Sequence, residues 1–269
     1  MQKMDFRGRW VLVTGASAGL GRELARYLAR KHGANLVVVA RRADRLEELK
    51  RETELESKVS VNTIAADLSD IADVERLLAA VKAGPQLYAA IMNAGVTHFG
   101  AHHELEWTAF QRMLNTNVTS AVRMTTELVP YIEQGAPGGG ILFVSSMAGI
   151  FPVPYQTAYS GTKAFMVHYA CGLWHELQGR DVSITTYAPG GIDTEMTGGE
   201  RFVPLRRFLM PAALCAAEGV EAFRRREYLH VPGLSNRLSA NIGRMLPRRL
   251  VTSFVAGTYR RALEAANRK

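Results

Sequence analysis

Short apolar runs alternate with amphipathic stretches over residues 10–187 of the chain. The runs are rich in β-branched residues, as in Leu36-Val37-Val38-Val39, which is typical of parallel strands covered on both faces. The intervening segments place apolar residues at helical spacing. Strands are predicted at 10–14, 35–40, 59–65, 88–92, 140–146 and 182–187, and helices at 20–30, 43–54, 71–82, 107–132 and 158–177. These alternations predict an α/β fold, a doubly wound parallel β-sheet flanked by helices.

The pattern changes after residue 194. Residues 196–210 mix glycine, arginine and bulky apolar residues without clean periodicity, which predicts a mobile substrate lid. The chain then predicts a helix from Pro211 to about 226, a strand at 228–231 and a basic helical segment at 234–267 broken at Pro247. We expect a single domain over residues 1–269: about 8–194 form the cofactor-binding and catalytic core, and about 195–269 form the lid and the basic C-terminal helices.

The composition is that of an ordinary globular protein, with 47% hydrophobic and 22% charged residues in 269. The sequence has no run of 18 apolar residues, which would indicate a membrane span, and no basic start followed by an apolar segment, which would indicate a secretory signal. We therefore expect a cytoplasmic protein. Two cysteines, Cys171 and Cys215, fit a reducing compartment. Metal-ligand spacing is absent, and we predict no metal site.

Positive charge is concentrated near the C-terminus. The net charge is +8, and residues 201–269 hold 14 Lys and Arg against 4 Asp and Glu. This asymmetry is consistent with a peripheral contact to an anionic membrane surface, an acidic partner or an acyl-CoA-like substrate, with a merely solvated face as the alternative. We expect no nucleic-acid partner.

A glycine-rich turn follows the first predicted strand. Gly15 and Gly19 stand between that strand and the helix at 20–30, and Gly21 stands in the first turn of that helix. Such glycines let the backbone approach a pyrophosphate, which the free N–H groups of the helix N-terminus then face. The turn therefore predicts a dinucleotide site.

The end of the second strand indicates which dinucleotide is bound. An acidic residue about 20 positions after the glycines would favour NAD(H), and this chain has Arg41 and Arg42 there. A guanidinium suits a 2′-phosphate, so we predict NADP(H), with NAD(H) as the alternative. The alternative interpretation is that Arg41 and Arg42 are surface residues at the start of the helix at 43–54 and bind no phosphate.

Tyr159 and Lys163 stand four residues apart in the apolar stretch at 158–177 and share one face of the predicted helix. A nearby ammonium would lower the pKa of a phenol, which suits acid and base chemistry. Thirteen residues upstream, Ser146 ends a predicted strand, where its hydroxyl could bond a substrate oxygen or cap a helix.

Further polar residues follow the third and fourth strands. Asp67 could contact an adenine amino group or cap a turn. Asn93-Ala94-Gly95 is a small-residue turn that allows a cofactor to approach closely. Asn117 lies inside the predicted helix at 107–132, where its amide or a freed carbonyl could hold water near Lys163, or where it could be a satisfied core residue.

Together these motifs resemble those of the short-chain dehydrogenase/reductase family. The matching set is Thr14-Gly15-(three residues)-Gly19-Leu20-Gly21, Asn93-Ala94-Gly95, Asn117, Ser146, Tyr159-(three residues)-Lys163 and Pro189-Gly190-(three residues)-Thr194. The resemblance runs from about residue 8 to 233, and residues 211–247 more loosely resemble a bacterial subgroup often labelled DltE-like. Two departures are Met92, where an asparagine often stands, and Ala18, where some NADP-using members have a basic residue.

The resemblance implies a Rossmann fold that binds NAD(P), and a role for each motif residue. Tyr159 would act as general acid in reduction and base in oxidation, Lys163 would lower its pKa and hold the nicotinamide ribose, and Ser146 would bond the substrate oxygen. Asn117 would continue the proton relay. The residues implied to bind the cofactor are Gly15, Ser17, Gly19, Leu20 and Gly21 at the pyrophosphate, Arg41 and Arg42 at the 2′-phosphate, Asp67 and Leu68 at the adenine, Asn93 at the adenosine-side ribose with Ala94 and Gly95 beside it, and Tyr159, Lys163, Pro189, Gly190, Ile192 and Thr194 at the nicotinamide.

These observations predict an NADP(H)-dependent oxidoreductase that interconverts a ketone or aldehyde and the corresponding alcohol. The alternatives are an NAD-dependent alcohol dehydrogenase and a non-catalytic, cofactor-binding regulatory protein. An apolar substrate pocket is expected from Met196, Phe202, Phe208, Leu209 and Met210. The resemblance also implies a homodimer or homotetramer that pairs through the helices at about 107–132 and 157–178.

Overall fold

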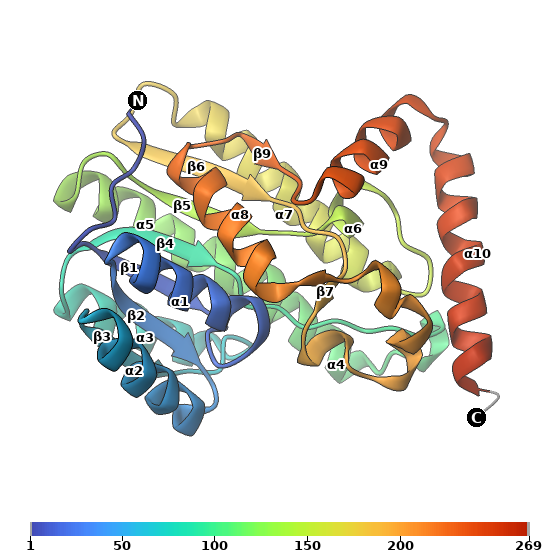
Figure 1. Cartoon of the computed structure of the whole chain (residues 1–269), viewed down its shortest axis with the longest axis horizontal. Helices are drawn as coiled ribbons and strands as arrows, with labels where there is room; N and C mark the ends of the chain where they lie inside the picture. Colours follow the sequence, from blue (N-terminus) through green and yellow to red (C-terminus); the bar gives the residue numbers. More distant parts are fainter. Residues whose placement is uncertain (1, 268–269) are drawn as a thin grey trace.

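Seven parallel strands form the central sheet, in the order β3-β2-β1-β4-β5-β6-β9 (Figure 1). The computed structural model describes residues 2–267. The strands are β1 (Trp10–Thr14), β2 (Asn35–Ala40), β3 (Val61–Ala65), β4 (Leu87–Met92), β5 (Gly139–Val144), β6 (Val182–Tyr187) and β9 (Leu229–His230). The predicted doubly wound parallel sheet is confirmed. Because the strand order reverses between β1 and β4, a crevice is expected at the carboxyl ends of these strands.

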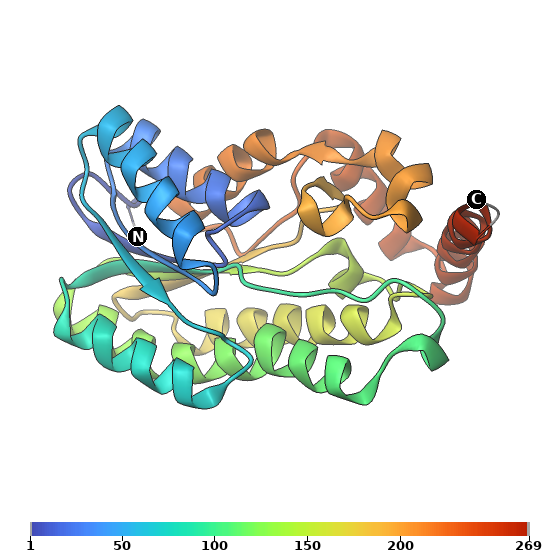
Figure 2. The same cartoon turned by 90° about the horizontal axis from the view of Figure 1, so that it is seen from below.

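Helices cover both faces of the sheet (Figure 2). One layer consists of α1 (Gly19–His32), α2 (Ala43–Ser57) and α8 (Ala212–Arg224), and the other of α3 (Ile71–Ala83), α5 (Ser120–Gly135) and α7 (Thr157–Glu176). Successive strand residues point to opposite faces, so Val11 and Val13 belong to the first core and Leu12 to the second. Burial on both faces explains why the strands are almost uninterruptedly apolar.

The long helix predicted at 107–132 contains a change of helical form. It consists of α4 (Trp107–Leu114), a π-helical turn η2 (Asn115–Thr119) and α5. The Ser120 amide donates to the Asn115 carbonyl, five residues earlier. π-helical turns of this kind occur often at functional sites, and this one brings Asn117 into the interior.

Two 3₁₀ helices occupy the segment predicted as a mobile substrate lid, whose mobility stays a prediction. They are η3 (Glu195–Thr197) and η4 (Glu200–Phe208), flanked by the paired short strands β7 (Ile192–Asp193) and β8 (Met210–Pro211). A 3₁₀ helix has three residues per turn, so its sequence does not show the 3.6-residue period of an α-helix. Residues 196–210 therefore lack the α-helical period in their sequence because they form 3₁₀ helices instead of an α-helix.

The C-terminal part is helical and broken at Pro247, as predicted. It consists of α9 (Leu234–Met245) and α10 (Arg248–Asn267), and α10 lies along one end of the molecule in both views (Figures 1 and 2). Ala262 of α10 packs in an apolar cluster with Leu205 of η4 and Phe99. Within residues 2–267, no helix is both long enough and apolar enough to cross a membrane.

Candidate active site

A cavity of about 580 Å³ lies where the strand order reverses, at the carboxyl ends of the strands. Every residue predicted to bind the cofactor lines this cavity, and so do three of the four predicted catalytic residues, Ser146, Tyr159 and Lys163. The fourth, Asn117, is buried behind the wall. The fold therefore gathers motifs from six strand ends into one site.

The glycine turn after β1 is too tight for side chains. Gly15 has a φ of 70°, which favours glycine, and a Cβ on Gly21 would lie 2.2 Å from the Gly15 carbonyl oxygen. Ala18, at the start of α1, provides no side-chain cap, so the first N–H groups of the helix have no side-chain partner beside the cavity. This backbone cradle fits a pyrophosphate group.

Asn93 holds the glycine turn in place. Its side-chain amide donates to the Thr14 carbonyl at 2.9 Å, and its backbone N–H donates to the Thr14 hydroxyl at 3.0 Å. The Thr14 hydroxyl in turn donates to the Ile91 carbonyl at 3.1 Å. The amide predicted to contact a ribose is therefore occupied by the backbone, although Asn93 still borders the cavity.

The two arginines predicted at the 2′-phosphate both line the cavity. Arg42 donates to the Ser17 hydroxyl, with Nη2 at 3.2 Å, and pairs with Glu195. Arg45 also pairs with Glu195, with Nη1 and Oε1 3.0 Å apart. The hydrogen bond from Arg42 is the main reason that the pKa of Glu195 is lowered. Sequence reasoning missed Glu195 and Arg45. Arg45 stands three residues after Arg42 at the start of the predicted helix, but no local pattern links Glu195 to these arginines.

Asp67 has protein partners on both carboxylate oxygens. Oδ1 accepts from the Ser69 amide and hydroxyl at 3.0 and 2.8 Å, and Oδ2 lies 3.3 Å from Arg112 and 3.9 Å from Arg41. The turn-capping alternative is therefore realised in the structure. A contact between Asp67 and an adenine stays a prediction.

Tyr159 and Lys163 lie one turn apart on α7, as the spacing predicts. Burial raises the pKa of Tyr159 to about 12, and a hydrogen bond with Ser146 acts in the opposite direction. Burial also lowers the pKa of Lys163 to about 8. The Lys163 ammonium donates to the Val144 carbonyl at 2.9 Å and lies 5.8 Å from the centre of the Tyr159 ring. Burial therefore has the largest effect on the pKa of Tyr159, and the lowering of that pKa by Lys163 stays a prediction.

Ser146 caps a helix, which is one of the roles that the sequence left open, and its contact with a substrate oxygen stays a prediction. Its hydroxyl caps the short helix α6 (Met147–Ile150) by accepting from the Ala148 amide at 3.1 Å. The same hydroxyl donates to the Pro189 carbonyl at 3.3 Å and faces the cavity beside Tyr159. The cap fixes the hydroxyl at the end of β5, where it can meet a substrate oxygen.

Asn117 holds the loop after β4. Its carbonyl oxygen accepts from the Val96 amide at 2.8 Å, and its NH₂ group donates to the Val96 carbonyl at 2.9 Å and to Thr162 at 3.0 Å. Both N–H donors of the side-chain amide are therefore occupied, and a water contact through its oxygen stays a prediction. A relay through the Asn117 main-chain carbonyl stays a prediction.

Part of the cavity wall comes from the chain beyond residue 195. The predicted apolar residues Met196, Phe202, Phe208 and Leu209 line the cavity, whereas Met210 does not. Val255, Thr258 and Tyr259 of α10 also line it and were not predicted. Their spacing of three and four residues within a basic helix was the available signal. The wall that would meet a substrate is mostly apolar.

Comparison with known proteins agrees with the arrangement of the site. Residues 9–201 match the family described as short chain dehydrogenase. Very-long-chain 3-oxoacyl-CoA reductase-A of Danio rerio is 34% identical over 194 residues, covering 71% of this chain and 60% of the relative. Sulfoacetaldehyde reductase of Chromohalobacter salexigens is 32% identical over 256 residues, covering 93% of this chain and 98% of the relative. A solved short-chain dehydrogenase from Sphingobium yanoikuyae in complex with NADPH shares 29% identity with a TM-score of 0.79, covering 91% of this chain and 95% of that one.

The fold and the cavity define a dinucleotide-binding α/β protein. The chain belongs to the short-chain dehydrogenase family. It spans just over half the length of the very-long-chain 3-oxoacyl-CoA reductases that it matches. The looser resemblance to the DltE-like subgroup stays a prediction.

Proposed function

We propose that the protein is an NADP(H)-dependent oxidoreductase that interconverts a ketone or aldehyde and the corresponding alcohol. One observation carries this proposal: Ser146 at the end of β5 and Tyr159 and Lys163 on α7 line the same cavity as the glycine turn. A protein that only bound a nucleotide would have no need of a phenol, a hydroxyl and an ammonium at that place. This argues against the alternative of a non-catalytic regulatory protein.

The side chains at the site can manage the proton of a carbonyl reduction. Bound reduced nicotinamide would supply the hydride for the carbonyl carbon. A phenol with a pKa of about 12 is protonated at neutral pH, so Tyr159 is present as a proton donor for the carbonyl oxygen. Ser146 would turn its O–H from the Pro189 carbonyl toward that oxygen, donate a hydrogen bond to it and orient it. With a pKa of about 8, Lys163 stays mostly charged at neutral pH and would stabilise the phenolate that remains after proton transfer.

We propose NADP(H) as the preferred cofactor. Support comes from Arg41 and Arg42, two guanidinium groups that border the cavity beside Ser17. A 2′-phosphate could accept hydrogen bonds from such groups. The Glu195 carboxylate already pairs with Arg42, and this favours the second candidate, an NAD-dependent alcohol dehydrogenase. The two are separated by comparing kcat/KM for NADPH and NADH in the wild type and in Arg41→Asp, which should reverse an NADPH preference.

We infer an apolar carbonyl substrate. The lining residues Phe202, Phe208 and Leu209 of the lid region, together with Tyr259 of α10, support this inference. Two relatives are named as reductases of very-long-chain 3-oxoacyl-CoA and of sulfoacetaldehyde, which are substrates of very different polarity. The mostly apolar wall of this chain is closer in character to the first.

We also propose how the protein is organised in the cell. The proposal is a single domain, with residues 8–194 as the catalytic core, that forms a homodimer or homotetramer. Exposed aromatic residues on the two long helical segments, Trp107 and Phe165, support pairing there. Two free cysteines support a cytoplasmic location. Within that compartment we propose a peripheral membrane contact through the basic C-terminal region.

Cofactor titration and turnover assays together test the proposed NADPH-dependent reductase activity. Calorimetric titration of the pure protein with NADPH and NADH should give tighter binding of NADPH. A panel of aliphatic, aromatic and steroid-like ketones is then followed by nicotinamide absorbance, and turnover is expected for apolar members. Tight binding without any turnover would favour the regulatory alternative, and no binding of either nucleotide would contradict the proposal from the glycine turn onward.

A further inference from the structure

The two C-terminal helices carry a stripe of exposed apolar side chains. Three of its members are almost fully exposed: Leu234 at 78%, Met245 at 86% and Phe254 at 76%. The whole set, called the apolar stripe below, is Leu234, Leu238, Ile242, Met245, Leu246, Leu250 and Phe254. Single exposed apolar residues are ordinary, but six on two consecutive helices and a seventh, Leu246, between them indicate a surface that has a partner.

The charge around the apolar stripe has one sign. Residues 234–267 contain only one acidic residue, Glu264, and six arginines: Arg237, Arg244, Arg248, Arg249, Arg260 and Arg261. Within residues 2–267, only Arg237 among these forms an ion pair, with Glu218 at 3.7 Å. An apolar helix face bordered by uncompensated arginines is typical of helices that lie at a membrane interface.

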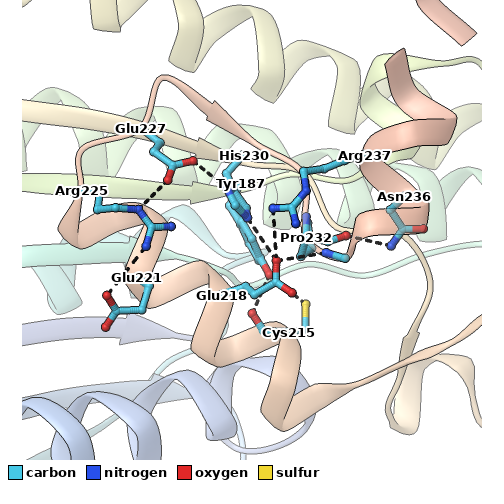
Figure 3. A network of polar contacts seen from close by, with 11 residues as sticks. Tyr187, Cys215, Glu218, Glu221, Arg225, Glu227, His230, Pro232, Asn236 and Arg237 are labelled. Atoms are coloured by element: carbon cyan, nitrogen blue, oxygen red, sulfur yellow. Dashed lines mark hydrogen bonds and ion pairs between the residues drawn. The ribbon is translucent and has the colours of Figure 1, made fainter. Parts of the chain in front are cut away.

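A polar network fixes the start of α9 to the body of the protein (Figure 3). Glu218 of α8 accepts from the Gly233 amide at 3.1 Å and pairs with Arg237. The Asn236 amide donates to the Pro232 carbonyl at 3.0 Å. The apolar stripe thus begins on a helix that is held by the central fold.

α10 is fixed to the body as well. Arg260 donates to the Tyr155 hydroxyl at 3.0 Å, and Ala262 is buried with Phe99 and Leu205. Because another face of α10 lines the cavity, the helix cannot turn its apolar stripe inward without opening that wall. The stripe is therefore presented outward by an anchored element.

We propose that the apolar stripe and its arginines dock on the surface of a membrane that contains anionic phospholipid, with α9 and α10 lying in the interface. This inference rests on the membrane contact proposed above and identifies the face that makes it. The charge distinguishes a membrane from a second copy of the chain. A two-fold contact of this face with itself would bring arginines against arginines, whereas lipid phosphates oppose them with negative charge.

Vesicle co-sedimentation of the purified full chain tests the docking surface. The wild type should sediment with vesicles that contain phosphatidylserine, should not sediment with phosphatidylcholine alone, and should be released by high salt. The double variant Arg248→Glu with Arg249→Glu should lower the partition coefficient by about 30-fold or more, because each basic residue near an anionic surface contributes to binding. Leu250→Ser with Phe254→Ser should also lower it, through lost apolar burial.

A matched control reverses the charge of two basic residues outside α9 and α10. Lys3→Glu with Arg51→Glu changes two exposed basic residues far along the chain and should change the partition coefficient by less than about threefold. Failure of the wild type to sediment with phosphatidylserine vesicles at low salt overturns the proposal. So does a result in which the stripe variants only dissociate an oligomer in ultracentrifugation. NADPH binding, titrated on the same samples without vesicles, reports separately on the reductase.

Discussion

Arg42 and Glu195 form an ion pair, with Nη1 and Oε2 3.1 Å apart, although they are 153 residues apart in the chain. Both line the cavity, and Arg42 also donates to Ser17 in the glycine turn. The guanidinium proposed to meet a 2′-phosphate is therefore already bonded to a carboxylate. NADP(H) would have to displace that carboxylate or share the guanidinium with it.

Removing the charge of Glu195 should favour NADPH. In Glu195→Gln, Arg42 and Arg45 lose a competing anion, so the Kd for NADPH should fall by up to about fivefold, the range expected for an exposed ion pair. The Kd for NADH should change much less. Calorimetric titration with both nucleotides measures the difference, which should shrink at high salt.

Glu200→Gln is the control for that change, because Glu200 is an exposed acid of the same segment. It should leave both nucleotide affinities unaltered. Weaker NADPH binding in Glu195→Gln would mean that Glu195 organises the two arginines for the phosphate, and the competition argument would be wrong.

Loss of the Tyr159 hydroxyl should stop turnover and spare cofactor binding. Tyr159→Phe keeps the ring but removes the proton donor, so kcat should fall by about 10²–10⁴-fold, the usual contribution of general acid catalysis. The Kd for NADPH should stay within about twofold. Tyr169→Phe, the same change on the same helix but outside the cavity lining, should retain activity. Near-normal turnover in Tyr159→Phe would refute the proposed proton donor.

The buried ammonium of Lys163 should make stability depend on pH. Burial lowers its pKa from 10.5 to about 8, so between these values the unfolded chain holds a proton that the folded chain has released. The free energy of unfolding should therefore rise with pH over that window. Relative to Lys163→Met, the wild type should gain up to about 3 kcal/mol between pH of about 7.5 and 10.

Urea unfolding of the cofactor-free protein at several pH values measures this gain. Lys3→Met removes an exposed lysine and should follow the wild type throughout. A difference between the wild type and Lys163→Met that is independent of pH would show that the ammonium is as well solvated as in the unfolded chain.

Elements set by local pattern were predictable from the sequence. The run Leu36–Val39 predicts a strand because a parallel strand buried on both faces is apolar at every position. The four-residue spacing of Tyr159 and Lys163 places them on one helix face in any α-helix. The family resemblance then predicted a site whose residues the structure does bring together, with Asn117 just behind the wall.

Properties set by distant contacts were not predictable in this way. The pair of Glu195 with Arg42 depends on how the segment after β6 returns over the end of β2. The pKa of Tyr159 depends on burial and on the hydrogen bond with Ser146, and the Lys163 ammonium donates to the Val144 carbonyl. Helical spacing determines that two residues are neighbours, but not which atom the longer side chain contacts.

A methyl group on Gly21 should disrupt the cofactor site. The added Cβ would lie 2.2 Å from the Gly15 carbonyl and 2.5 Å from the Asn93 amide, and the first of these is backbone that cannot rotate away. Gly21→Ala should therefore push the turn away from α1, weaken NADPH binding at least about tenfold and cost about 1–3 kcal/mol of stability, the usual cost of overpacking.

Gly172→Ala is the matched control: its Cβ meets nothing within 4 Å, and a helical glycine replaced by alanine should stabilise the protein by up to about 1 kcal/mol. Thermal unfolding and NADPH titration of both variants measure the contrast. Unchanged NADPH affinity in Gly21→Ala would show that the turn is not the pyrophosphate cradle, because the added Cβ displaces the backbone of this turn directly.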